Sequence, residues 1–98
     1  MNGTFYVDYE RIRKRGDYVY YWELLDLPRP DTSGHLSYKL YAQGDCNMFR
    51  YKFIISMTYP APMGEGNGQT QYEPGIWEYP PPDSANEVNL KSVCAYAK

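Results

Sequence analysis

Alternating apolar and polar positions recur along much of the chain, a pattern typical of half-buried β-strands. Residues 36–41 alternate in this way, and residues 50–59 do so over a longer run. Few residues separate the two runs, so we expect them to pair as an antiparallel hairpin. The alternation in the second run predicts one shared face for four of its side chains, Tyr51, Phe53, Ile55 and Met57.

The aromatic run at residues 18–27 carries apolar groups on both of its faces, which predicts a central strand. Shorter strands are predicted at residues 5–9, 69–72 and 76–79, between turns rich in glycine and proline. These segments together indicate an antiparallel sheet.

One helix is predicted near the end of the chain. Ser84 is a suitable N-cap, and Glu87 three residues later completes a capping box. Apolar side chains then recur with helical spacing and form one stripe, made of Leu90, Val93, Cys94 and Ala97. Because the sequence contains no repeat and no linker, we expect a single α+β domain over residues 1–98. Its architecture would be an antiparallel sheet of about five to six strands with this helix packed on one face.

Composition supports a small folded domain. Of the 98 residues, 12 are tyrosine and 8 are proline, which favours short strands joined by turns. The formal net charge of −2 provides no global field for nucleic acid, so we expect no nucleic-acid partner. No apolar run approaches the roughly 18 residues that a membrane helix requires. Residues 1–4 lack the features of a signal peptide, so the chain is either cytoplasmic or the mature part of an exported precursor.

Two cysteines, Cys46 and Cys94, are present, either as free buried thiols or as partners in a disulfide. A disulfide would close a loop of about 49 residues and stabilise the fold by about 4 kcal/mol on the chain-entropy model. It would also imply an oxidising compartment. A structural zinc site is not expected, because His35 is the only histidine and no Cys-x-x-Cys spacing occurs.

Catalytic chemistry has little support in the sequence. Residues 64–68 are rich in glycine but lack the Gly-Lys-Ser/Thr of a phosphate-binding loop, so we interpret them as a turn. A nucleophilic pair of Cys46 with His35 would require a free thiol. Nothing in the spacing of the 12 acidic residues singles out a glycosidase pair. We therefore expect no enzyme activity, no cofactor and no metal.

The one basic cluster is residues 11–15, which places Arg11, Arg13 and Arg15 on one face if the segment is extended. Such a face suits a sulfated sugar, a lipid phosphate or an acidic protein patch. The alternative, which we favour, is a solvated edge strand whose charges prevent pairing with other sheets.

Aromatic side chains exceed what so small a core needs, so some of them must be partly exposed. Tyrosine and tryptophan are favoured in protein interfaces because they combine contact area with a polar group. The alternative is a structural role, as cover for a sheet face or in a homodimer. The candidate binding surface consists of Arg11, Arg13, Arg15, Tyr20, Trp22, Tyr38 and Tyr41.

Several short motifs occur together in a characteristic order. They are Gly16, Trp22-Glu23-Leu24, Ser37, Asp45-Cys46, Arg50, Tyr59-x-x-Pro62-Met63-Gly64-x-Gly66, Trp77, Pro81-Pro82-x-Ser84 and Lys91-x-x-Cys94. Over about residues 5–94, this series resembles the surface-adhesin protein E-like domain family of bacterial envelope proteins. The resemblance implies an antiparallel sheet, a C-terminal helix, and a disulfide from Cys46 to Cys94. It also implies an exported precursor, often a lipoprotein, and the family prototype is an adhesin that binds host matrix proteins.

We therefore expect a non-catalytic, adhesin-like domain of the bacterial cell envelope, in the periplasm, on the outer surface or secreted. It would bind a protein partner, such as an extracellular-matrix or envelope protein, through an aromatic sheet face. Any membrane attachment would run through a lipid anchor on the precursor. Two alternatives remain open: a self-associating structural envelope protein that forms a homodimer, and an inhibitor of an envelope-degrading enzyme.

Overall fold

The structure is a computed structural model that describes residues 3–97, and within them the fold consists of one six-stranded antiparallel sheet and one α-helix. The strands are β1 (Thr4–Val7), β2 (Arg13–Arg15), β3 (Tyr18–Asp26), β4 (Ser37–Asp45), β5 (Arg50–Tyr59) and β6 (Gln69–Tyr72). Two short 3₁₀ turns, η1 (Tyr9–Arg11) and η2 (Pro62–Gly64), and the helix α1 (Ala85–Tyr96) complete it. The predicted α+β class is confirmed.

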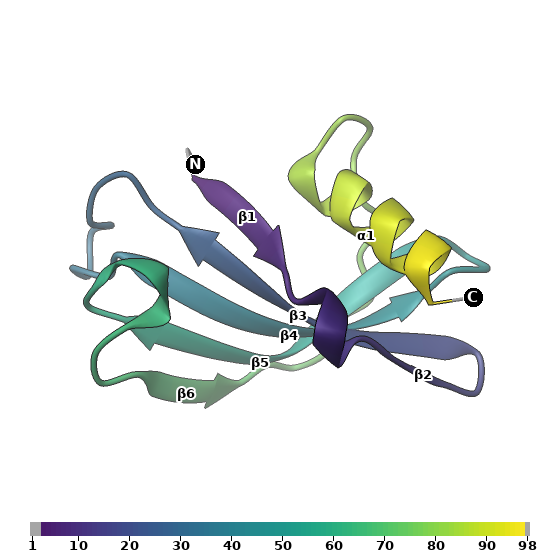
Figure 1. The fold of residues 1–98 in the computed structure, drawn as a ribbon, viewed down its shortest axis with the longest axis horizontal. Coiled ribbons are helices and arrows are strands. Elements are labelled where there is room, and N and C mark those ends of the chain that lie inside the picture. The colour runs from purple at the N-terminus through teal and green to yellow at the C-terminus, as the bar shows by residue number, and fades with distance from the viewer. Residues whose placement is uncertain (1–2, 98) are drawn as a thin grey trace.

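The strands follow the order β1-β3-β4-β5-β6, with β2 also paired to β3. β1 pairs with residues 23–26 of β3 and β2 pairs with residues 18–20, so the two short strands together form one edge of the sheet. The central position of β3 and the antiparallel hairpin of β4 and β5 are confirmed (Figure 1). The segment 76–79, expected as a short strand, forms only a single bridge, between Tyr51 and Glu78.

The edge of the sheet is interrupted between β1 and β2. The carboxylate of Asp8 accepts a hydrogen bond from the backbone N–H of Glu10 at 3.2 Å and holds Nη1 of Arg11 at 2.6 Å. These contacts cap η1 and turn the chain. The first strand therefore ends at Val7, short of the predicted boundary at residue 9. The expectation of an extended segment that aligns three arginines is wrong for Arg11, which lies in the turn.

A β-bulge divides β5 into two halves. The pairing with β4 shifts between Phe53 and Ile55, which leaves Ile54 as the inserted residue. Because side chains alternate along a strand, the insertion moves the two halves of the predicted apolar face to opposite sides. Tyr51 and Phe53 lie on the side of the helix, whereas Ile55 and Met57 lie on the other side. The prediction of one shared face for these four residues is wrong.

The helix packs on one face of the sheet (Figure 1) and begins where the sequence predicts. The hydroxyl of Ser84 accepts a hydrogen bond from the N–H of Glu87 at 3.1 Å, and the Glu87 carboxylate accepts one from the N–H of Asp83 at 3.0 Å. The first bond satisfies a donor of the first helical turn, whereas the second fixes the residue before the cap. The N–H of Ser84 donates to the carbonyl of Pro81 at 3.2 Å, so the reciprocal bond of the predicted capping box is absent. The predicted apolar stripe faces the sheet, with Leu90 and Val93 fully buried. No helix within residues 3–97 is long and apolar enough to cross a membrane.

A disulfide joins the end of β4 to α1. The sulfur atoms of Cys46 and Cys94 are 2.09 Å apart, and their Cα atoms are 5.8 Å apart. The bridge that the family resemblance implies is therefore present, and the reading of two free thiols is wrong.

Gly44 leaves no room for a side chain where Leu90 of the helix packs on the sheet. A Cβ atom at this position would lie 2.8 Å from Cδ1 of Leu90 and 3.0 Å from Cγ2 of Val19. We expect Gly44→Ala to lower the free energy of unfolding by about 2 kcal/mol, because the added methyl group forces α1 away from β4. Urea unfolding of the variant and the parent protein measures the difference, with Gln43→Ala on the opposite face as the control. Equal midpoints for Gly44→Ala and the parent would contradict this account of the packing.

Candidate binding surface

The sheet face opposite α1, named here the open face, carries most of the predicted binding residues. Side chains of residues that pair directly across antiparallel strands point to the same side. Trp22 pairs with Tyr41, and Tyr20 pairs with Arg13. Alternation along β3 places Tyr20 and Trp22 on the open face, whereas Tyr21 between them is buried beneath the helix. Five of the seven predicted residues therefore lie together and are named here the aromatic–arginine patch: Arg13, Arg15, Tyr20, Trp22 and Tyr41.

The aromatic rings of this patch contact one another. The ring centroid of Tyr41 lies 4.8 Å from that of Trp22 and 6.2 Å from that of Tyr20. Cζ of Arg15 lies 5.6 Å from the Tyr20 ring centroid, within the range of a cation–π interaction. All three aromatic side chains are half-buried. Each is thus held against the sheet while part of its surface remains available to a partner.

Trp77 extends the open face beyond the patch. Its ring centroid lies 5.6 Å from that of Tyr18, 4.4 Å from Cζ of Arg50 and 4.5 Å from Nζ of Lys52. The bridge at Glu78 holds this segment against β5. No local pattern in the sequence indicates this contact, because the segment that carries Trp77 is irregular and its position depends on the bridge to β5.

Two predicted residues lie outside the patch. Arg11 is in η1, and Tyr38 is on the helix side of the sheet, where its hydroxyl donates to the carboxylate of Asp31. That carboxylate also accepts the N–H groups of Ser33 and His35, each at 2.9 Å. The hydrogen bond from Tyr38 and those from the backbone lower the pKa of Asp31, and the same carboxylate raises the pKa of Tyr38 to about 12. Tyr38 therefore fastens the loop between β3 and β4.

The residues considered for catalysis do not assemble into a reactive site. Cys46 is bonded to Cys94 and has no thiol to act as a nucleophile. His35 is half-buried, and its ring meets that of Tyr38 edge-on with the ring centroids 5.8 Å apart. Within the described part of the chain, no group of three or more His, Cys, Asp or Glu side chains is arranged to hold a metal ion.

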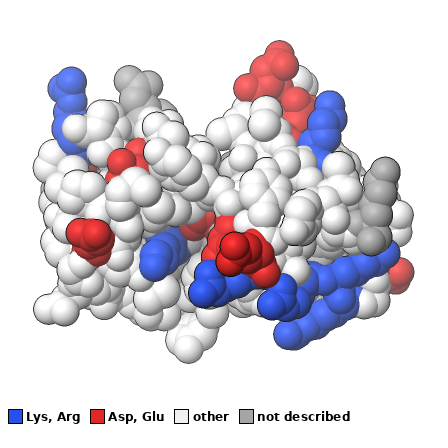
Figure 2. Space-filling model, viewed as in Figure 1, with Lys and Arg blue, Asp and Glu red and all other residues white. Residues whose placement is uncertain are grey.

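Positive charge is concentrated on the open face. The ion pairs within residues 3–97 are Arg11 with Asp8, His35 with Asp31, and Arg50 with Asp45. The cations of the open face that belong to none of these pairs are Arg13, Arg15, Lys39 and Lys52. Figure 2 shows basic side chains gathered over β2, whereas carboxylates stand at the start of α1. A chain with a formal net charge of −2 thus presents a basic face.

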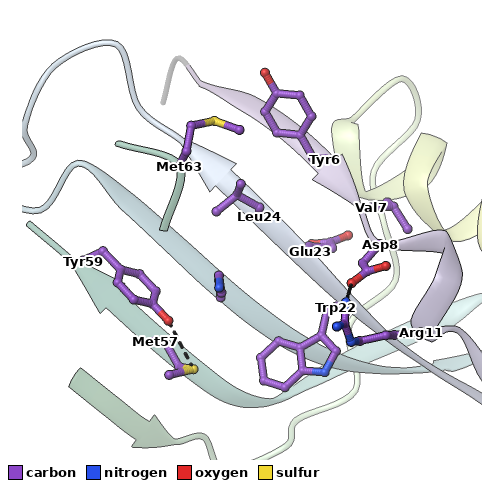
Figure 3. A pocket seen from close by; sticks show the side chains of 11 residues that line it. Tyr6, Val7, Asp8, Arg11, Trp22, Glu23, Leu24, Met57, Tyr59 and Met63 are labelled. Atoms are coloured by element: carbon purple, nitrogen blue, oxygen red, sulfur yellow. Dashed lines mark hydrogen bonds and ion pairs between the residues drawn. The ribbon is translucent and has the colours of Figure 1, made fainter. Parts of the chain in front are cut away.

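A groove of about 650 Å³ adjoins the patch on the open face (Figure 3). Its lining comes from β1, β3, β4 and β5 and from Asp8 after β1, and it includes Trp22, Leu24, Lys39, Met57 and Tyr59. Met63 of η2 lies at one end of the groove and Arg11 of η1 lies at the other. Apart from Trp22 and Arg11, these residues were not predicted as part of a site, because turns distant in the sequence build the two ends.

Fold and surface together define a small α+β domain that is closed by a disulfide and has an open aromatic face. The model of the surface-adhesin protein E family matches residues 1–95, and the chain belongs to this family. The family is one of surface adhesins, which implies a location at the cell envelope or the cell surface. A comparison with curated proteins gives no match.

Proposed function

We propose that the chain is a non-catalytic binding domain of the bacterial cell surface and that it engages a protein partner through the aromatic–arginine patch. The observation that carries this proposal is the convergence of Arg13, Arg15, Tyr20, Trp22 and Tyr41 on the one sheet face that α1 leaves uncovered. The Cys46–Cys94 disulfide supports an oxidising compartment, as expected for an exported protein.

The composition of the patch suits a protein interface. Tryptophan, tyrosine and arginine are the residues that contribute most often to binding energy in such interfaces. The rings of Tyr20, Trp22 and Tyr41 already rest on one another, so little side-chain entropy is lost when a partner covers them. Arg13 and Arg15 add positive charge that accelerates encounter with an acidic partner and orients it.

We expect the double variant Tyr20→Ala/Tyr41→Ala to bind its partner at least about tenfold more weakly, because two interface aromatics are lost. Its melting temperature should change little, because both side chains lie outside the core beneath the helix. Surface plasmon resonance against a panel of purified host-matrix and envelope proteins measures binding. A matched control is Tyr9→Ala/Tyr96→Ala. It removes two tyrosines away from the patch, one in η1 and one at the end of α1, whose ring centroids lie 5.4 Å apart.

Other outcomes of these measurements would contradict the proposal. A melting temperature that collapses in Tyr20→Ala/Tyr41→Ala would assign the rings to the core. Light scattering that reveals a tight dimer, converted to monomer by the same variant, would favour the self-associating structural role. Inhibition of a lysozyme or a protease that survives loss of the patch would favour the inhibitor role.

A further inference from the structure

At one end of the groove beside the patch, Met63 is held in an unfavourable backbone conformation. Met63 has φ 57° and ψ 30°, in the left-handed region that side chains other than glycine rarely adopt. Its N–H donates to Oδ1 of Asp26 at 2.8 Å, and the N–H of Gly64 donates to the hydroxyl of Ser37 at 2.8 Å. Ser37 is fully buried and in turn donates to the carbonyl of Ala61 at 2.6 Å. Hydrogen bonds to β3 and β4 thus hold the backbone of the turn in place, while Met63 remains 47% exposed.

This arrangement presents a thioether at the end of a preformed groove. Strained backbone that neighbouring contacts hold in place is frequent at ligand sites. In Figure 3 the side chains of Met63 and Leu24 lie at one end of the groove, with Trp22 farther along β3. Leucine, methionine and indole surfaces suit a large apolar side chain, because such a group leaves water on entering.

Four charged residues line the groove together with its apolar groups. Asp8 and Arg11 form an ion pair at the end opposite Met63, Glu23 is buried, and Lys39 is the remaining one. Nζ of Lys39 lies 5.4 Å from the ring centroid of Tyr59, and within residues 3–97 it forms no ion pair. The methylene stem of Lys39 is packed beside Gly64, since a Cβ on that glycine would lie 2.6 Å from Cε of the lysine. The charge is therefore held beside the apolar end of the groove and is available to an anion.

We propose that this groove binds an acidic segment of a protein partner, a proposal that rests on the protein-binding function proposed above. One aromatic or large aliphatic side chain of the segment enters between Trp22, Leu24 and Met63, and a neighbouring carboxylate pairs with Lys39. Charge complementarity favours an acidic segment, because the cations elsewhere on the open face, Arg13, Arg15 and Lys52, also form no ion pair within residues 3–97. The carboxylate of Asp8, which lines the far end of the groove, is neutralised by Arg11. A sulfated glycan would match this charge but would leave the apolar end unused.

The test uses a short peptide with one central phenylalanine flanked by glutamates, titrated into the isotopically labelled protein and followed by NMR. We expect saturable shifts of the Trp22 indole and of the Lys39, Met57 and Met63 amides, with the Trp77 indole unchanged. Replacing the phenylalanine with serine, or the glutamates with lysine, should abolish the saturation. Each replacement removes one of the two features that the groove recognises.

Two variants remove the recognising groups while keeping the fold. Met63→Asn retains a residue that tolerates the left-handed conformation and deletes the thioether. Lys39→Met retains the packing of the stem and deletes the charge. Each should raise the dissociation constant for the peptide at least about fivefold. The matched control is Lys91→Met, which removes an exposed cation from the helix on the other side of the sheet. It should leave the dissociation constant for the peptide unchanged within about twofold.

Three results would overturn the groove proposal. They are equal binding of the serine peptide, shifts spread over the whole basic face, and groove shifts produced by a heparin-derived oligosaccharide but not by the peptide. Each of these leaves the proposed function standing if Tyr20→Ala/Tyr41→Ala still loses its protein partner. If Tyr20→Ala/Tyr41→Ala still binds its protein partner and the peptide binds the groove saturably, the proposal for the patch would be wrong and the proposal for the groove would stand.

Discussion

Replacing Cys46 and Cys94 with alanine is expected to lower the free energy of unfolding by about 4 kcal/mol. The bridge spans a sequence separation of 48 residues, so its loss returns a large amount of conformational freedom to the unfolded chain. A domain of this size has a total stability of roughly 5–15 kcal/mol. Loss of the bridge should therefore move the midpoint of urea unfolding to a much lower urea concentration, which circular dichroism measures.

Reduction of the parent protein provides the control for this substitution. If the bridge itself carries the effect, the parent protein in reductant and the double alanine variant should unfold at nearly the same urea concentration. A large difference between them would assign part of the loss to packing of the cysteine side chains, which lie at the margin of the core. A parent protein whose midpoint is insensitive to reductant would contradict the expected contribution.

The sequence predicts the bounds of strands better than their faces, since a bulge splits the predicted face of β5 and all four residues of β6 are exposed. β5 and β6 have the predicted bounds, residues 50–59 and 69–72, and α1 follows its predicted cap. β4 runs on to Asp45, beyond the alternating residues 36–41 that predict it. Its last part contains small and polar residues, Ala42, Gln43 and Gly44, which carry no strand signal of their own. They are extended because β3 and β5 pair with them on both sides.

The candidate site could be predicted only as far as strand alternation reaches. Tyr20 and Trp22 are two positions apart and share a face, which the sequence alone indicates. Tyr38 and Tyr41 are three positions apart on one strand, so the same rule already separates them. The groove was missed because Met63 and Arg11 are placed by turns. The turn at Met63 depends on a hydrogen bond that the Asp26 carboxylate accepts across 37 residues, a partner that spacing cannot identify. The turn at Arg11 is capped locally by Asp8, which the predicted strand over residues 5–9 did not anticipate.

Glu23 is a buried acid in the middle of β3, beneath the helix. Its side chain is 2% exposed, and Nδ2 of Asn89 on α1 donates to Oε2 at 2.9 Å. Oε1 has no hydrogen-bond partner among the described residues. Burial raises the pKa of Glu23 to about 7, and the bond from Asn89 opposes only part of this rise. The carboxyl group therefore changes charge near neutral pH inside the packed protein.

We expect the free energy of unfolding to fall by about 3 kcal/mol as the pH rises from near 4.5 to above 7. In the unfolded chain the carboxyl group has a pKa of 4.5, so over this interval the folded protein keeps a proton that the unfolded chain has lost. Stability is therefore greatest at the acidic end of the interval. Asp31 and Asp45 have lowered pKa values, so they remain ionised throughout it and lose their contribution only at lower pH.

Urea unfolding at about pH 5 and about pH 8 measures this dependence. Glu23→Gln cannot ionise, so we expect it to flatten the profile and to be the more stable protein at the higher pH. Glu65→Gln, in an exposed loop, serves as the control and should keep the parent profile. A Glu23→Gln profile as steep as that of the parent would place the titrating group elsewhere. A flat profile in the parent would mean that water or a local opening stabilises the charged carboxylate beneath α1.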